Sequence, residues 1–268
     1  MLECVINISE GRRLDVIAEI RSGLGNDLLD IHSDYHHHRS VFTTVGTDIP
    51  RQLAQLCARA FDLREHVGVH PRIGIIDVVP FVPLDETTMQ EALAARNEFA
   101  EYAATELGIP SFFYGPERDL PEIRKRAFVD LEPDTGPNRA HPTAGAICVG
   151  ARQVLVAYNV WLKNARIEDG RLIARKLRSR EVRTLGLQLG DEIQISMNLT
   201  APDVVGPADV YDEIAKLAEI SRAELVGLVP ARALAQIPKV RWSELDLSKE
   251  KTIEWCLAAR NRALQNLD

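Results

Sequence analysis

Short apolar runs alternate with amphipathic segments along the first third of the chain. Four runs rich in aliphatic and β-branched residues predict strands, at 4–8, 28–31, 40–45 and 73–79. Apolar positions at helical spacing predict helices between them, over 14–24 and 50–64. The predicted order is strand, helix, strand, strand, helix, strand, and a long amphipathic helix over 86–107 follows.

The same order returns in the second half of the chain. Four segments predict strands and two predict helices, in the order 154–160, helix 172–178, 182–188, 192–199, helix 208–220 and 224–229. A last helix is expected over 252–264. We therefore expect an α+β fold built from two β-α-β-β-α-β units, each with one antiparallel sheet backed by two helices. Ligand sites favour clefts between such units.

The stretch between the two repeats, residues 115–145, has a different character. Five prolines punctuate it, and the run Asp134-Thr135-Gly136-Pro137 has strong turn chemistry. A loop of this length inside a compact domain is either disordered or functional. We expect this loop to be functional.

Composition limits the classes of function. Hydrophobic residues make up 46% of the 268 residues and charged residues 26%, as is usual for a globular protein. A net charge of −7 without a long basic run argues against nucleic-acid binding. No apolar run approaches the ~20 residues of a membrane span, and the N-terminus lacks a signal-peptide pattern. We expect a cytoplasmic protein with four reduced cysteines, because none has metal-site or redox spacing.

Histidine is concentrated in one region, since six of the seven fall within residues 32–70. Consecutive histidines at 36–38 point apart and rarely converge on one ion, so a solvated polar loop is the better interpretation than a metal site. His66 and His70 have the i, i+4 spacing of a helical zinc pair. Gly68 between them indicates a loop, and no glutamate occupies the general-base position, so a zinc peptidase is excluded.

The run His70-Pro71-Arg72 places an imidazole on a rigid turn. Pro71 favours an extended backbone at His70, and Arg72 adds a permanent cation suited to carboxylate recognition. An imidazole titrates near neutrality and suits proton transfer. The residues alone leave a catalytic and a structural role for His70 equally open.

Polar residues also lie where the first strand meets the first helix. Ser9 is expected to cap that helix, and Glu10 to interact favourably with the helix dipole. A cap does not explain Asn7. Three more polar residues open a strand or lie within one, and they could line a site or make structural hydrogen bonds: Arg39, Asn159 and Asn198.

Longer strings give a more specific signal. Residues 3–11 resemble the "ECVPNFSEG" opening of glutamate formiminotransferases, and 70–81 resemble the "HPRIGATDVCPF" string of that family. Further similar strings occur in the same order along the chain, at 39–46, 134–137, 141–152, 157–160, 196–199 and 224–230. Collinear matches from residue 3 to residue 230 rarely arise by chance.

The resemblance implies two ferredoxin-like subdomains, residues 1–153 and a shortened 154–268, with a folate tunnel between them. His70 corresponds to the catalytic histidine of the family. The folate-binding stretch corresponds to Gly136, Pro137, Asn138, Arg139, Ala140, His141, Pro142, Thr143, Ala144 and Gly145. The candidates for substrate binding are Asn7, Arg39, Arg72, Asn159 and Asn198, with Arg39 or Arg72 holding a substrate carboxylate.

The reaction implied is transfer of the formimino group from N-formimino-L-glutamate to N5 of tetrahydrofolate, a step of one-carbon metabolism and histidine degradation. Tetrahydrofolate is then a co-substrate, and no metal is implied. The chain has no room for the helical cyclodeaminase domain of the bifunctional relatives, so a separate cyclodeaminase would act on the product. A homodimer is left open.

Three positions depart from the family pattern. His32 replaces an aspartate, His38 replaces an asparagine, and Trp161 replaces an asparagine. Three alternatives therefore stay open: the same fold acting on another one-carbon or amidine donor, a folate-binding protein without catalysis, and a metal-binding protein that uses the histidine cluster.

Overall fold

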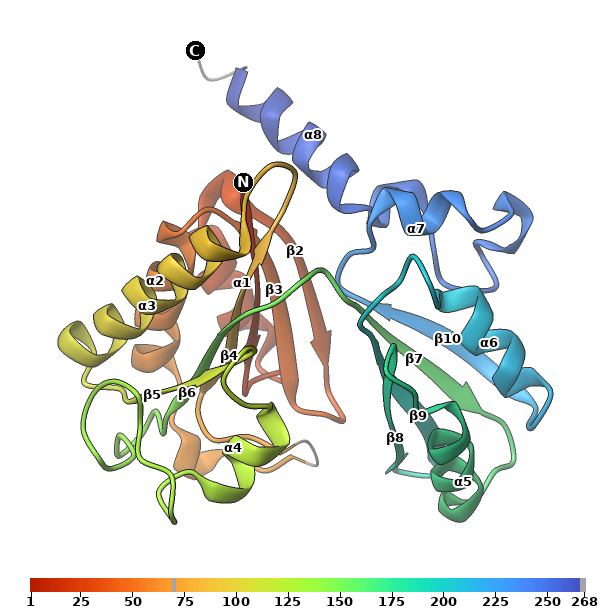
Figure 1. Ribbon diagram of the computed structural model, residues 1–268, viewed down its shortest axis with the longest axis horizontal. Helices are drawn as coiled ribbons and strands as arrows, with labels where there is room; N and C mark the ends of the chain where they lie inside the picture. Colours follow the sequence, from red (N-terminus) through yellow and green to blue (C-terminus); the bar gives the residue numbers. More distant parts are fainter. Residues whose placement is uncertain (69–70, 266–268) are drawn as a thin grey trace. The chain divides into compact units, whose positions relative to one another are not determined.

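The computed structural model describes residues 1–68 and 71–265, and the chain divides into two compact units, Met1–Gln153 and Val154–Asp268 (Figure 1). Unit 1 begins with the predicted order of strands and helices: β1 (Leu2–Ile8), α1 (Leu14–Ser22), β2 (Leu28–Asp34), β3 (Arg39–Val45), α2 (Asp48–Ala60) and β4 (Ile76–Pro83). Four more elements complete it: α3 (Met89–Glu106), β5 (Ser111–Tyr114), α4 (Leu120–Arg126) and β6 (Ile147–Ala151).

The sheet of unit 1 has the order β2-β3-β1-β4-β6-β5. Its first four strands are antiparallel and have the topology expected for a β-α-β-β-α-β unit. The expectation of a wholly antiparallel sheet was wrong, because β6 pairs in parallel with both β4 and β5. Both added strands are short, four and five residues, and neither was predicted from the sequence.

Helices cover the two faces of this sheet unequally. Buried side chains of α1, α2 and α3, such as Ile17, Leu53 and Phe99, join one apolar core on the first face. On the other face, Ile123 of α4 packs with Val78 of β4 in a smaller cluster. Side chains of a strand point alternately to the two faces of the sheet. Because apolar clusters cover both faces, β4 is buried along almost its whole length.

The predicted loop at 115–145 contains a helix, α4, which the sequence analysis missed. Asp119 caps it by accepting a 2.8 Å hydrogen bond from the backbone N–H of Glu122. Pro121 lies in the first turn of this helix, where its missing N–H costs little, although the sequence predicts a loop here. A proline therefore marks a helix start here.

The helix expected over 50–64 also ends earlier than predicted. α2 stops at Ala60 because Phe61 takes an extended conformation, with φ −128° and ψ 150°. A short 3₁₀ turn, Leu63–Glu65, follows, and the Asp62 side chain accepts the backbone N–H of Arg64. This break turns the chain toward the His-Pro-Arg segment.

Unit 2 repeats the topology of the first four strands of unit 1. Its elements are β7 (Val156–Leu162), α5 (Ile167–Leu177), β8 (Val182–Leu189), β9 (Glu192–Leu199), α6 (Pro207–Ala215), β10 (Ile220–Val226), α7 (Ala231–Ala235) and α8 (Ile253–Gln265). The four strands form an antiparallel sheet in the order β10-β7-β9-β8. The expected α+β class, with a β-α-β-β-α-β order in each half, is confirmed.

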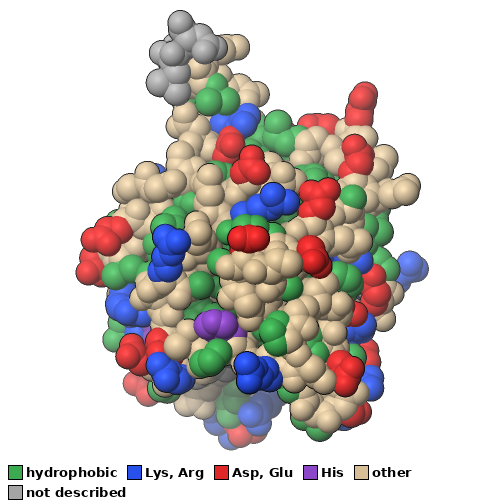
Figure 2. Space-filling model, turned by 90° about the vertical axis from the view of Figure 1, so that its left-hand side faces the viewer, with side chains coloured by type: hydrophobic (Ala, Val, Ile, Leu, Met, Phe, Trp, Pro, Cys, Tyr) green, Lys and Arg blue, Asp and Glu red, His purple; other side chains and the backbone are tan. Residues whose placement is uncertain are grey.

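Charges are mixed on the face seen in Figure 2, where acidic and basic side chains lie side by side. That face offers no broad field of one sign. Within the described residues, no helix is both long and apolar enough to cross a bilayer.

Gly186→Ala tests the packing of α5 on β8. A Cβ at Gly186 would lie 2.5 Å from the carbonyl carbon of Gly170, which is helix backbone and cannot rotate away. We expect a loss of roughly 1–3 kcal/mol in the free energy of unfolding, the usual cost of overpacking, measured by urea titration. Gly23→Ala is the control, because its Cβ would meet its nearest atoms at 3.5 Å. Equal stability of the two variants would contradict this packing.

Candidate functional site

Ser9 joins the end of β1 to the segment before β4. Its hydroxyl donates a 2.7 Å hydrogen bond to the carbonyl oxygen of Gly74, and its backbone N–H donates to that of Ile75, also at 2.7 Å. The expectation that Ser9 caps α1 was wrong. The N-cap of α1 is Arg13, four residues further on, and it makes no side-chain capping bond. Ser9 therefore fixes one segment to another.

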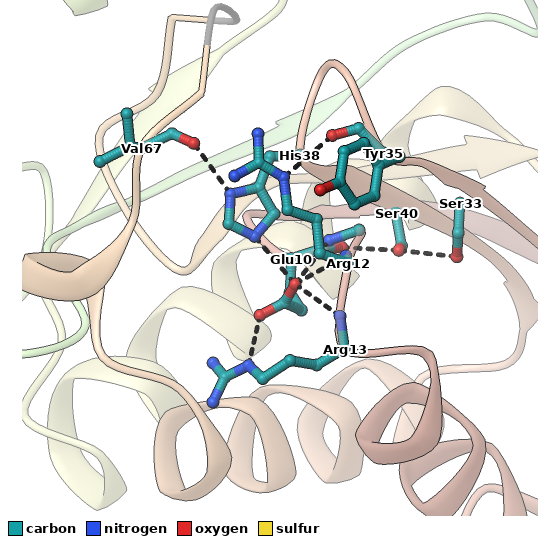
Figure 3. A network of polar contacts seen from close by, with 9 residues as sticks. Glu10, Arg12, Arg13, Ser33, Tyr35, His38, Ser40 and Val67 are labelled. Atoms are coloured by element: carbon teal, nitrogen blue, oxygen red, sulfur yellow. Dashed lines mark hydrogen bonds and ion pairs between the residues drawn. The ribbon is translucent and has the colours of Figure 1, made fainter.

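Glu10 organises the turn that follows Ser9 (Figure 3). One carboxylate oxygen accepts the backbone N–H groups of Gly11, Arg12 and Arg13 at 2.9, 2.8 and 3.1 Å. The other accepts Nε of Arg13 at 2.7 Å. Burial opposes ionisation of this side chain, but the bonds from Arg12, Arg13 and His38 outweigh it and lower the pKa of Glu10 to about 2. The carboxylate is ionised at neutral pH.

His38 connects Glu10 to another loop. Its Nε2 lies 2.9 Å from the Glu10 carboxylate, its Nδ1 lies 3.0 Å from the carbonyl oxygen of Val67, and its ring centre is 4.0 Å from that of His66. The expectation of a solvated polar loop was wrong for His37 and His38, which are 2% and 8% exposed. Among the residues described, no three His, Cys, Asp or Glu side chains are arranged to hold a metal ion.

The hairpin between β2 and β3 packs directly on the Glu10 turn. A Cβ at Gly11 would lie 2.3 Å from the carbonyl oxygen of Asp34 and 2.6 Å from the backbone nitrogen of Arg39, so only glycine fits. Ser40 donates a 2.6 Å hydrogen bond to the backbone oxygen of Glu10. The hairpin therefore carries Arg39, one of the predicted site residues, to this turn.

The predicted folate stretch runs beside residues 73–75, which follow the His-Pro-Arg segment in the sequence. Backbone hydrogen bonds of 2.7 and 2.9 Å run from the nitrogen of Leu63 to the oxygen of Thr143 and from that of Ile75 to Ala144. Gly145, with φ +74°, leaves no room for a side chain, because its Cβ would lie 2.2 Å from the oxygen of Ile73. Residues some 70 positions apart in sequence are thus in contact.

The candidate catalytic residue, His70, lies outside the described residues, but its described neighbours are held firmly. Asp77, 2% exposed, accepts the backbone N–H of Ile73 at 2.8 Å and Nη2 of Arg124 at 2.6 Å. Arg72 packs its guanidinium against Gly68, where a Cβ would lie 2.8 Å from Nη2. Burial lowers the pKa of Arg72; Asp77 opposes this, and Arg124 adds to it.

A cavity of about 260 Å³ opens among these elements. Its lining combines the Glu10 turn with the loop before the His-Pro-Arg segment: Ser9, Glu10, Arg12, Arg13, His38, Asp62, Glu65, His66 and Ile75. The sequence analysis did not assign Glu10 or His38 to the site. The available signal was an acidic residue two positions after the strand predicted at 4–8, where only an interaction with the helix dipole was expected of Glu10.

The other predicted site residues have separate surroundings. Asn7 donates a weak 3.3 Å bond to the oxygen of Val5, and Asn138 donates to Glu132 at 2.8 Å. Two candidates belong to unit 2 instead. Asn159 donates to Glu224 at 2.9 Å, and Asn198 is exposed.

Trp161 of unit 2 shares a partner with Asn159. Its indole nitrogen lies 3.3 Å from the same oxygen of Glu224, and the guanidinium of Arg222 stacks 3.9 Å from the centre of a ring. Asn159 and Trp161 of β7 therefore both contact the carboxylate of Glu224 on the neighbouring strand β10.

Comparison with known proteins assigns the family. Residues 1–152 match the formiminotransferase domain, N-terminal subdomain. A glutamate formimidoyltransferase of Streptococcus pyogenes serotype M1 is 35% identical over 289 aligned residues, covering 94% of this chain and 97% of that protein. A protein of the same name from Thermoplasma acidophilum is 34% identical, covering 89% and 91%. The formimidoyltransferase-cyclodeaminase of Sus scrofa is 32% identical over 87% of this chain and 51% of its own length.

The fold and these matches define a two-unit α+β protein of the transferase class. The chain belongs to the formiminotransferase family, for which folate is the expected co-substrate.

Acid sensitivity tests the role of Glu10. Because the folded-state pKa is lowered, the stability that Glu10 contributes is fully present above about pH 4.5 and is lost as pH falls toward about 2. We expect Glu10→Gln to be less stable than the native protein at pH 7, and the two stabilities to converge in this window. Urea titrations between pH 7 and pH 3 measure this. Glu19→Gln, on the exposed face of α1, is the control. If the native protein and Glu10→Gln differ in unfolding free energy by the same amount at every pH, the lowered pKa of Glu10 is contradicted.

Proposed function

We propose that this chain transfers the formimino group from N-formimino-L-glutamate to N5 of tetrahydrofolate, giving 5-formimino-tetrahydrofolate and L-glutamate. The observation that carries the proposal is the similarity, over nearly the whole of each chain, to two proteins named glutamate formimidoyltransferase. The candidate site of unit 1 suits this chemistry. Backbone hydrogen bonds hold the turn-rich stretch 141–145 against Leu63 and Ile75, and the half-buried cation of Arg124 pairs with Asp77.

His70 is the proposed general acid and base. It would take the proton of N5 as this nitrogen attacks the formimino carbon, and return a proton to the departing amino nitrogen of glutamate. Such proton transfer typically contributes 10²–10⁴-fold to the rate. The anchoring of Ile73 by Asp77 supports the assignment, because a proton donor must be held still relative to the reacting atoms.

The stretch 136–145 is proposed to bind tetrahydrofolate. Its hydrogen bonds to Leu63 and Ile75 hold it against residues on both sides of the His-Pro-Arg segment in the sequence, which supports a shared site for folate and His70. Gly136, with φ +84°, supports a tight turn at the start of the stretch. Asn7, Asn159 and Asn198 are proposed to contribute polar contacts to the substrates.

Arg39 and Arg72 are proposed to bind carboxylates of the substrates. Both substrates are anionic, and arginine suits bidentate carboxylate recognition. At Arg72 burial disfavours the cation and Arg124 adds repulsion, while Asp77 offsets part of this cost. An incoming carboxylate would offset more of it.

A different one-carbon or amidine donor is the second candidate. The observation that favours it is the Trp161–Glu224 contact, because an indole occupies a position where the family has an asparagine. A donor other than N-formimino-L-glutamate would be revealed by tetrahydrofolate binding without turnover of that substrate. We further propose that no metal takes part, that the protein acts in the cytoplasm, and that a separate cyclodeaminase acts on the product.

Replacement of His70 tests the proposed catalyst. Purified protein is incubated with tetrahydrofolate and N-formimino-L-glutamate, and the methenyl-tetrahydrofolate formed on acidification is read by absorbance. We expect His70→Ala to lose about 10²–10⁴-fold in kcat while it keeps its fold and its affinity for tetrahydrofolate. Near-native turnover in this variant would remove His70 from the mechanism, and silence of the native protein would refute the donor.

Conservative changes test the two arginines. We expect Arg72→Gln and Arg39→Gln each to raise a KM by roughly 10- to 150-fold, which corresponds to the loss of a charge-assisted hydrogen bond of about 1.5–3 kcal/mol. The effect on kcat should be smaller. Arg59→Gln, on α2 outside the site, is the control. Unchanged KM values in the double variant Arg39→Gln, Arg72→Gln would contradict carboxylate binding by either residue.

A further inference from the structure

We propose that Glu10 and His38 form a positioning pair that holds the backbone at Val67, and through it the segment that carries His70. Neither residue is assigned a role by the sequence motifs. The inference rests on the proposed role of His70, and it concerns how that residue is kept in place.

The segment before His70 buries little apolar surface of its own. The side chain of Val67 is 76% exposed, and Gly68, which is also exposed, has no side chain. Burial of apolar surface therefore cannot fix this backbone. The 3.0 Å contact from His38 Nδ1 to the Val67 oxygen is a bond to the main chain three residues before His70.

The ring that makes this bond is itself firmly held. His38 is 8% exposed, stacks on His66 and meets Glu10 through Nε2 at 2.9 Å. Its two ring nitrogens face two acceptors on opposite sides, the Glu10 carboxylate and the Val67 carbonyl oxygen, so the ring bridges the Glu10 turn and the loop. Its φ of +51° turns the ring inward from the end of the β2–β3 hairpin.

The Glu10 side chain is itself fixed to the turn that precedes α1. Three consecutive backbone N–H groups hold its carboxylate to the start of the α1 turn. The path from the sheet to the loop is therefore short and polar: β1, then Glu10, then His38, then Val67 (Figure 3). On the far side of His70, Asp77 holds Ile73 in a similar way, with Arg124 behind it. Val67 and Ile73, described residues on either side of His70, are thus each held by a buried polar side chain.

The test compares two replacements that both accept the left-handed backbone at position 38. Glycine and asparagine tolerate positive φ, but only asparagine keeps a side-chain donor. We expect His38→Gly to lower kcat about tenfold or more, as small misplacements of catalytic groups do, with KM values changed less than about twofold. We expect His38→Asn to recover most of this loss. His36→Ala, exposed on the same turn, is the control and should match the native protein.

The effect must act through His70. In a His70→Ala background, His38→Gly should cause no further loss of kcat, since there is no catalyst left to position. Glu10→Gln, which weakens the pair from its other end, should lower kcat in the same direction and serves if His38→Gly folds poorly. Equal kcat in the native protein and His38→Gly, or a loss that adds fully to that of His70→Ala, would overturn the inference.

Amide hydrogen exchange tests the pair without any turnover. In His38→Gly we expect the backbone amide of Gly68 to exchange faster than in the native protein. Exchange at Ile73 should stay unchanged, because Asp77 holds that amide independently of His38. Unchanged exchange at Gly68 would overturn the positioning role even if the native protein were inactive with N-formimino-L-glutamate. If the native protein is inactive but Gly68 exchanges faster in His38→Gly, the proposed function is refuted and the positioning role of Glu10 and His38 is retained.

Discussion

The arrangement of unit 1 at its candidate site depends on one buried carboxylate. A buried charge is stable only when several hydrogen bonds replace its hydration. Glu10 receives these from the turn after β1 and from Arg13, and it also contacts His38. The turn, the β2–β3 hairpin and the loop at Val67 are therefore arranged around the same group. This requirement also explains Gly11, since two backbone segments must approach closely for the hairpin to reach the carboxylate.

Two distant parts of the chain complete the site by backbone contacts. Leu63 and Ile75 bond to the stretch 141–145, whose glycine lets the two segments touch. Backbone contacts tolerate changes of side chain, so the proposed folate stretch can stay beside the His-Pro-Arg segment while neighbouring residues such as His38 vary. Such a site, held together by backbone contacts, is consistent with membership of the formiminotransferase family and with the proposed formimino transfer.

The repeated order of elements and the α+β class could be predicted because period and β-branched runs are local properties. Strands β5 and β6 could not, because a four- or five-residue apolar run next to prolines has no distinctive period. Ser9 was misassigned for a related reason: serine before a helix usually caps it, and only the tertiary partner Gly74 shows otherwise. The histidine run was expected in solvent, and the burial of His38 depends on Glu10, 28 positions away. Motifs supply the candidate residues, whereas long-range hydrogen bonds give the described part of the site its geometry.

The titration of Glu10 tests this account most directly. Carboxyl carbon chemical shifts of the native protein, labelled with ¹³C at glutamate, are followed by NMR from pH 7 downward. The account predicts that the Glu10 carboxylate stays ionised well below pH 4.5 and takes up its proton with a pKa of about 2. A Glu10 pKa near the ordinary value of about 4.3 would contradict it, because a carboxylate held by the Gly11–Arg13 turn and by His38 cannot take up a proton so readily.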